Sequence, residues 1–343
     1  MLEEKPFATL RRLDASSPLA GRPASSNPAA PELRALAPDE AAGYFLHIHP
    51  LWGGGLEPEL FSVYQRRLAA AAESLGRYEI LGLFEGTALV SAMKLYRFQG
   101  AHEGAPLALR GIGAVFTPQG QRRRGYAAHM LRLVLARAVS EGADAALLFS
   151  DIGTGYYQRL GFHPLESTEC KLDATMLPRG KGARPAGPGD EAAMIRTLAR
   201  HRAQGAGFSL EREDGWALRY QLRRLRELAR TRNVGEPDWG LIVDGRGREA
   251  SGAAMIRYTK EGLDILDAAW DTGAARDALL GGVRDRLLRA ASSSVRVWPA
   301  HQFRGLFPAG PRASAVAMVA PLSPRARALP GAARAELALL DHI

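Results

Sequence analysis

The sequence predicts an α/β (α+β) protein of two halves, each built on a mixed central sheet. In each half, three strand-like segments are followed by a helix and then by a further apolar strand. Residues 173–188 lie between the halves and hold three prolines and three glycines, which is typical of a linker. The shared order of elements indicates a distant internal duplication.

The first half is expected over residues 40–174, after an N-terminal segment, 1–39, whose Pro-, Ala- and Ser-rich stretch favours an extended chain. Periods of two and of 3.6 residues distinguish strands from helices along this half. They predict helices over 56–75, 125–141 and 154–160, and strands over 78–84, 87–98, 107–116, 143–150 and 163–172.

The second half is expected over residues 183–343. The same periodicities apply. They predict helices over 190–204, 215–230, 274–291 and 331–340, and strands over 239–243, 250–258, 263–269, 294–298 and 313–320. The second half is therefore expected to end in a helix.

The composition excludes several classes of protein. Apolar residues make up 46% of the chain, yet none of its apolar runs is long enough to span a membrane. The charged N-terminus lacks an apolar signal core, so a cytoplasmic location is expected. Cys170 is the only cysteine, which excludes an internal disulfide and a thiolate metal cluster. It lies in an alternating segment and is expected to be structural rather than nucleophilic.

The net charge of +9 raises the question of nucleic-acid binding. Only five of the 45 basic residues are lysines, and the arginines are interleaved with acidic residues. Arg122–Arg124 is the one tight basic cluster in the sequence, a small footprint for DNA. We therefore expect no nucleic-acid partner.

Residues 111–128 predict an anion site, because a strand, a loop and a helix start follow one another there. Backbone N–H groups at a helix N-terminus bind phosphate oxygens, and the helix dipole adds positive potential. Gly125 and Ala127 allow close approach of the backbone, and Arg122–Arg124 supply charge and forked donors. A solvated basic turn that begins a helix would have the same sequence.

Two motifs together resemble the GNAT N-acetyltransferase superfamily. Arg122-Arg-Arg-Gly125-Tyr-Ala127 fits the family loop Arg/Gln-x-x-Gly-x-Gly/Ala, and Tyr156-Tyr157-Gln-Arg-Leu-Gly161-Phe162 fits Phe-Tyr-x-x-x-Gly-Phe with Tyr in the first place. The resemblance implies an N-terminal GNAT fold, acetyl-CoA as acetyl donor and no metal. The second half lacks the loop, which implies a degenerate GNAT-like domain and one cofactor site per chain.

The resemblance also implies the site residues. The backbones of Val115 and Phe116 would pair with the pantetheine amides, and the loop that consists of Arg122, Arg123, Arg124, Gly125, Tyr126 and Ala127 would hold the pyrophosphate. Tyr157 would be the acid that protonates the CoA sulfur. The alternative for Tyr157 is a packing role only.

The arrangement resembles two-half relatives of the enhanced-intracellular-survival type, whose C-terminal carboxylate enters the active site. This implies the carboxylate of Ile343 as general base, and an ordinary packed terminus is the alternative. It also resembles a family that includes fungal lysine N-acetyltransferases, on residues 148–153 and 208–216. By that resemblance Ser150 and Asp151 would line the acceptor site, although Asp151 could instead cap a helix.

The expected reaction is transfer of an acetyl group from acetyl-CoA to a primary amine of a small molecule, such as lysine, a polyamine or an aminoglycoside. The alternatives are a non-catalytic acyl-CoA-binding regulator and a protein N-acetyltransferase. His47 and His49 have a spacing that could bind metal on a strand, but no third ligand is evident in the sequence nearby, which favours a structural role. The sequence leaves the oligomeric state open.

Overall fold

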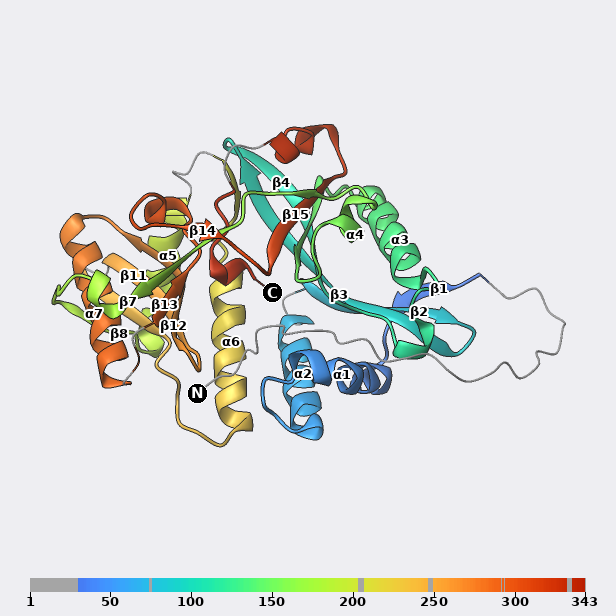
Figure 1. Cartoon of the computed structure of the whole chain (residues 1–343), viewed down its shortest axis with the longest axis horizontal. Coiled ribbons are helices and arrows are strands. Elements are labelled where there is room, and N and C mark those ends of the chain that lie inside the picture. The colour runs from blue at the N-terminus through green and yellow to red at the C-terminus, as the bar shows by residue number, and fades with distance from the viewer. Residues whose placement is uncertain are drawn as a thin grey trace, which may run out of the picture.

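In the computed structural model, two mixed β-sheets stand side by side, and helix α6 (Trp216–Thr231) lies between them (Figure 1). The structure describes residues 30–73, 76–202, 207–245, 249–290, 292, 294–331 and 335–342. The other α-helices are α1 (Pro38–Trp52), α2 (Pro58–Glu73), α3 (Tyr126–Ser140), α4 (Gly155–Gln158), α5 (Glu191–Arg202) and α7 (Gly273–Arg289).

The first sheet has the strand order β1-β2-β3-β4-β5-β15-β6, with β9 added to β3. Only β4 and β5 run parallel among these pairs of described strands. Its strands are β1 (Glu32–Ala35), β2 (Tyr78–Glu85), β3 (Ala88–His102), β4 (Ala105–Phe116), β5 (Ala145–Ser150), β6 (His163–Pro164), β9 (Phe208–Leu210) and β15 (Val316–Pro321).

The second sheet has the order β14-β7-β13-β12-β11-β10-β8, and here β12 and β13 run parallel. Its strands are β7 (Thr168–Asp173), β8 (Ala183–Pro185), β10 (Gly240–Asp244), β11 (Ala250–Tyr258), β12 (Gly262–Trp270), β13 (Ser294–Val297) and β14 (Gly310–Pro311). Both sheets thus contain a three-strand meander, a crossover helix and a parallel strand, which confirms the predicted α/β class and the repeated order.

The first half gives one strand, β7, to the second sheet, and the second half gives two strands, β9 and β15, to the first sheet. Strand β7 precedes the predicted boundary at 173–188, yet it pairs with β13 of the second sheet. Strand β15 comes from the end of the chain and pairs with β5 of the first sheet, Val316 opposite Ser150. Buried strand edges need hydrogen-bond partners, and the exchanged strands supply them. The predicted ranges 40–174 and 183–343 therefore do not correspond to separate sheets.

Helices cover both faces of each sheet. Side chains of α3 and α4 form one core with the first sheet, and those of α1, α2 and α6 form another on its opposite face. In the second sheet α7 covers one face, and α5 and α6 cover the other. Helix α6 thus contributes to cores on both sides, so it fixes the two sheets relative to each other.

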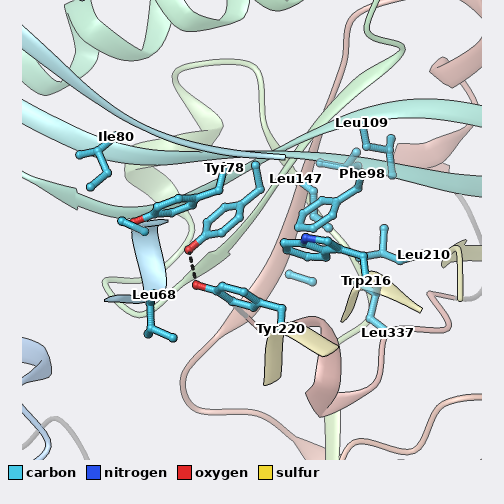
Figure 2. Close-up of a cluster of buried hydrophobic side chains, with 14 of the residues drawn as sticks. Leu68, Tyr78, Ile80, Phe98, Leu109, Leu147, Leu210, Trp216, Tyr220 and Leu337 are labelled. Carbon is cyan, nitrogen blue, oxygen red and sulfur yellow. Dashed lines mark hydrogen bonds between the residues drawn. The ribbon is translucent and has the colours of Figure 1, made fainter. Parts of the chain in front are cut away.

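An aromatic cluster joins α6 to the first sheet (Figure 2). The ring of Trp216 stacks on that of Tyr220, with centroids 5.0 Å apart and an angle of 8° between the planes. The Tyr220 and Tyr96 hydroxyls lie 3.3 Å apart and share a hydrogen bond. Phe98 meets Trp216 edge-on. Aromatic pairs add to the energy of burial, so this cluster stabilises the contact between the halves.

Six of the seven predicted helices are confirmed with small shifts at their ends, while the helix predicted over 331–340 is wrong. The chain makes 3₁₀ turns at Leu329–Gly331 and Leu339–Asp341, and residues 332–334 lie outside the described residues. The tail packs its leucines into a core that already exists, so burial does not require a helix. The strand expected over 163–172 is divided into β6 and β7.

Residues 1–29 of the segment expected to be extended lie outside the description, and of its described residues only Pro38 and Asp39 are helical. Strand β1 pairs with β2, and helix α1 begins at Pro38, a favoured first helical residue. The Arg34 guanidinium lies 3.7 Å from the centroid of the Phe84 ring and pairs with Glu40. Within the described chain, every helix is too short or too polar to cross a membrane.

Candidate active site

Strands β4 and β5 separate at their carboxyl ends. Their parallel pairing runs from Leu109–Ala145 to Ile112–Leu148 and stops there. Beyond this point β4 has a bulge, where Ala114 adopts a φ of 47° and its carbonyl accepts a 2.7 Å hydrogen bond from the Tyr44 hydroxyl. Bulges often occur beside active sites because they redirect a strand.

Val115 and Phe116 follow this bulge. Both are half-buried, and Phe116 lies opposite Ala92 on β3. The Phe116 carbonyl accepts a 2.9 Å hydrogen bond from the Ser91 hydroxyl. Both residues lie beyond the last β4–β5 pair, so none of the described strands pairs with the β5 side of β4 there.

The basic loop leads from β4 into α3. Its three arginines are exposed, and Arg123 has a φ of 63°. The Arg122 Nε donates to the Thr117 carbonyl (3.1 Å), and Arg124 Nη1 donates to Gln121 Oε1 (2.6 Å). Both acceptors are uncharged, so neither hydrogen bond neutralises the charge of its guanidinium. The loop therefore presents positive charge at the N-terminus of α3.

Gly125 is the residue that precedes α3, with a φ of 83°. A Cβ there would meet no atom within 4 Å, so the left-handed backbone rather than lack of space requires glycine. Tyr126 begins the helix and is buried, and its hydroxyl donates to Glu85 Oε2 (2.9 Å). Ala127 is half-buried. The Tyr126 side chain therefore anchors the loop to the β2–β3 turn, and only its backbone belongs to the predicted anion site.

Tyr157 lies in α4, directly after β5, and is 8% exposed. Its ring contacts those of Tyr156 and Phe162 edge-on, at centroid distances of 5.0 and 5.9 Å. Burial, with smaller contributions from Tyr156 and the Asp151 carboxylate, raises the pKa of Tyr157 to about 12. The phenol thus keeps its proton at neutral pH and can donate it.

Ser150 is the last residue of β5, and Asp151 follows it in the segment that leads to α4. The buried Ser150 hydroxyl donates to the Gly153 carbonyl (2.6 Å). Asp151 Oδ1 accepts a 2.9 Å hydrogen bond from the Ala315 N–H, just before β15. The residue that caps α4 is Thr154, so the alternative of Asp151 as a helix cap is wrong. Asp151 instead ties the end of β5 to the exchanged strand.

The C-terminal tail reaches the end of β5. The His342 ring lies 5.3 Å from that of Phe149 and 5.4 Å from that of Trp298, between centroids. Gln221 Nε2 on α6 donates to the carbonyls of Leu340 and His342, each at 3.1 Å. Ile343, the predicted base, lies outside the described residues.

A buried ion cluster holds this tail in place. Arg212 pairs with Asp341 (2.6 Å) and with Asp267 (3.0 Å), and Asp267 also pairs with Arg202 (2.9 Å). All four are more than nine-tenths buried. Burial raises the pKa of Asp341, and the arginines oppose that rise. The tail is therefore fixed by charges in the second half.

Lys94 is a buried residue that the sequence reasoning missed. It lies on β3, its Nζ donates to Gln65 Oε1 (2.8 Å), and it is 9% exposed. Burial, with a smaller contribution from Arg224, lowers the pKa of Lys94 to about 7. The signal in the sequence was the alternation of Lys94 with Ala92 and Tyr96, which places the lysine on a strand face that a period of two predicts to be buried.

The remaining candidates from the sequence are two histidines and the cysteine. His47 and His49 are on helix α1, so the strand expected for them is wrong. His47 stacks on Phe116, and His49 Nε2 lies 2.7 Å from the Leu56 carbonyl. The described residues contain no cluster of side chains that could hold a metal ion. Cys170 is fully buried in β7.

The second sheet lacks the equivalent anion site. At the N-terminus of α7 the Thr272 hydroxyl accepts a 3.1 Å hydrogen bond from the Ala275 N–H. Asp271 precedes it and pairs with Arg200 and His201. Thr272 and the acidic Asp271 thus precede α7, whereas the basic loop precedes the equivalent helix α3 in the first half.

The comparisons with known proteins agree with this geometry. Residues 33–165 match the family model described as an acetyltransferase (GNAT) domain. A search of curated proteins finds no match.

Three solved structures share the fold of the chain at low sequence identity. A probable N-acyltransferase from Enterococcus faecalis is 16% identical, over 85% of this chain and 72% of its own, with a TM-score of 0.64. A GCN5-related N-acetyltransferase from Kribbella flavida is 18% identical, over 87% and 74%, with a TM-score of 0.63. Eis1 from Mycobacterium abscessus is 19% identical, over 85% and 74%, with a TM-score of 0.51. Residues 33–165 of the chain are therefore an acetyltransferase (GNAT) domain, and the chain as a whole shares its fold with these N-acetyltransferase structures.

Proposed function

We propose that the chain transfers an acetyl group from acetyl-CoA to a primary amine of a small molecule, by direct attack in a ternary complex. The observation that carries the proposal is the separation of β4 from β5 at their carboxyl ends, with the basic loop following β4 and Tyr157 following β5. A thioester between these groups would lie beside the end of β5.

The donor site is proposed on β4 and the loop. The backbones of Val115 and Phe116 would pair with the amides of the pantetheine arm. Arg122, Arg123 and Arg124 would bind phosphate oxygens, together with the backbone N–H groups from Gly125 to Ala127. The exposure of the three arginines and the left-handed Gly125 support this assignment. The capped N-terminus of α7 supports one such site per chain.

Tyr157 is proposed as the acid. The amine nitrogen attacks the thioester carbonyl carbon and forms the new C–N bond. The C–S bond then breaks, and the Tyr157 hydroxyl gives its proton to the departing thiolate. A phenol whose pKa is raised to about 12 by burial remains protonated for this step.

The terminal carboxylate of Ile343 is proposed as the base that removes the proton from the attacking amine. The described tail supports this, since His342 packs on Phe149, one residue before Ser150. Gln221 and the ion cluster of Arg212 and Asp341 hold the tail there. Ser150 and Asp151 would line the acceptor site at the same end of β5.

Release of free CoA thiol tests this function. The assay offers acetyl-CoA with lysine, polyamines, aminoglycosides and peptide N-termini, and Tyr157→Phe serves as the matched variant. We expect one class of small amines to release thiol and to form the acetylated amine in equal amount. Binding of acetyl-CoA without release with any amine would instead favour a non-catalytic acyl-CoA-binding protein.

A further inference from the structure

Arg312 is a buried arginine that no acidic residue neutralises at short range. It lies between β14 and β15 and is 7% exposed. Its Nε and Nη1 are buried and have no hydrogen-bond partner within the described part of the chain. The other buried arginines there each pair with a carboxylate: Arg110 with Glu141, Arg202 and Arg212 with Asp267, and Arg286 with Asp238.

The surroundings of Arg312 stabilise its position without satisfying its N–H groups. The guanidinium carbon lies 3.6 Å from the centroid of the Trp298 ring, a cation–π contact. Burial lowers the pKa of Arg312 to about 10, an effect that Glu169 opposes and Arg296 increases. Glu169 itself pairs with Lys171. Buried polar groups are almost always hydrogen-bonded in folded proteins, and buried charges are almost always paired. The unmade bonds of Arg312 therefore call for an anionic ligand.

The position of Arg312 connects it to the proposed acceptor site. Its backbone N–H donates to the Ser167 carbonyl (3.0 Å), and the same segment is tied to Asp151 three residues later, through Ala315. Trp298, on which the guanidinium lies, contacts the ring of Phe149 on β5 at 5.7 Å. The arginine thus belongs to the wall where β5, β15 and the C-terminal tail meet.

We propose that Arg312 binds the carboxylate of the acceptor, so that the acceptor is an amino acid rather than a polyamine or an aminoglycoside. This inference rests on the proposed acetyl transfer to a small amine. A planar carboxylate matches the forked N–H groups of a guanidinium, and an arginine already held against an indole ring loses little freedom on binding. An amine without a carboxylate would leave these donors unpaired.

The test compares amino acids with the amines that lack only the carboxylate: lysine with cadaverine, ornithine with putrescine, and phenylalanine with phenethylamine. Wild type, Arg312→Met and Arg312→Lys are assayed for KM and kcat. We expect wild type to prefer the amino acid of the pair it uses. Arg312→Met should raise the KM for that amino acid by about 10- to 100-fold, from the loss of charged hydrogen bonds. The KM for the matched amine should stay the same, and Arg312→Lys should recover part of the preference.

Thermal unfolding separates ligand binding from a structural role. Removing an unpaired buried charge should leave the melting temperature of Arg312→Met unchanged or higher, whereas a structural arginine would lower it. Arg276→Met, at a half-buried pair with Asp277 in the second half, is the matched control and should change neither the KM values nor the melting temperature.

Two results would overturn the inference. In the first, wild type has the same kcat/KM for the amino acid and the amine of every pair. In the second, Arg312→Met lowers kcat/KM for the amino acid and for its matched amine by the same factor. Thermal shift with lysine and with cadaverine, without turnover, distinguishes this from failure of the proposed function. A shift with lysine alone that disappears in Arg312→Met would support the carboxylate site even if no amine were acetylated. A shift of equal size with both ligands would count against it.

Discussion

The imidazole of His342 lies edge-on against the phenyl ring of Phe149, with 5.3 Å between the ring centroids and 77° between the planes. This contact brings the end of the chain to the end of β5, beside Ser150 and Asp151. Residues of the second half hold it there, through Gln221 and Arg212. The described tail thus lies against the strand that ends at Ser150, a residue of the proposed acceptor site.

Extending the chain by one glycine after Ile343 should lower kcat by about 100-fold, because it moves the proposed base away from the amine. The matched control is Ile343→Val, which keeps a carboxylate at the same position and should keep most of the activity. Steady-state kinetics with acetyl-CoA and the amine that wild type acetylates fastest give kcat for the extended chain and for Ile343→Val. An unchanged kcat in the extended chain would remove the terminal carboxylate from the mechanism.

Tyr157→Phe should lower kcat by about 100-fold or more while the affinity for acetyl-CoA changes little, since only the proton donor is lost. The ring contacts with Tyr156 and Phe162 do not need the hydroxyl, so the fold should be retained. Tyr156→Phe is the control, because it removes a phenol hydroxyl from the neighbouring residue and leaves that of Tyr157 in place. Equal kcat in wild type and Tyr157→Phe would leave Tyr157 a packing residue.

Lys94 should make stability depend on pH. The pKa of a lysine in an unfolded chain is about 10.4, while burial lowers the pKa of Lys94 in the folded chain to about 7. Between these values the unfolded chain binds a proton that the folded chain does not, so this contribution to stability rises with pH. It is fully present above the unfolded pKa and is lost as pH falls toward about 7.

Urea unfolding at roughly pH 7 and roughly pH 9.5 measures this contribution, with Lys94→Met as the comparison. The free energy of unfolding of wild type should increase relative to that of Lys94→Met between the two pH values. Parallel pH dependence in the two proteins would show that Lys94 is charged in the folded state.

Arg212→Met should destabilise the protein by about 3–5 kcal/mol, because it leaves the buried carboxylate of Asp341 without its partner. The double variant Arg212→Met with Asp341→Leu should recover part of the loss, since the unpaired charge is then gone. Urea unfolding gives the free energy of unfolding of wild type, of Arg212→Met and of the double variant. A loss of less than about 1 kcal/mol in Arg212→Met would show that the cluster does not hold the tail.

The sequence was informative where a local pattern determines the structure. The period of the apolar residues predicted both meanders and the crossover helices α3 and α7, and the motif around Gly125 predicted a loop at a helix N-terminus. The left-handed φ of Gly125 is itself a local requirement. Tyr157 could be placed after β5 for the same reason, because α4 follows the strand within a few residues.

Contacts between distant residues could not be predicted in this way. The exchange of β7 and β15 depends on which strand edge is available in the folded sheets, and no periodicity records that. The pairs of Asp151 with Ala315 and of Arg212 with Asp341 join residues more than a hundred positions apart. Lys94 was missed for a different reason, because its place on a face predicted to be buried was visible in the sequence and was not used.

Calorimetric titration of acetyl-CoA tests the central claim most directly, that the basic loop before α3 is the donor site. Wild type should bind one acetyl-CoA per chain, and Arg122→Ala combined with Arg124→Ala should weaken binding by about 10- to 100-fold through loss of charged hydrogen bonds to phosphate. Arg276→Ala, at the start of α7 in the second half, should bind as wild type does. Unchanged affinity in the double variant, or two sites per chain, would contradict the account.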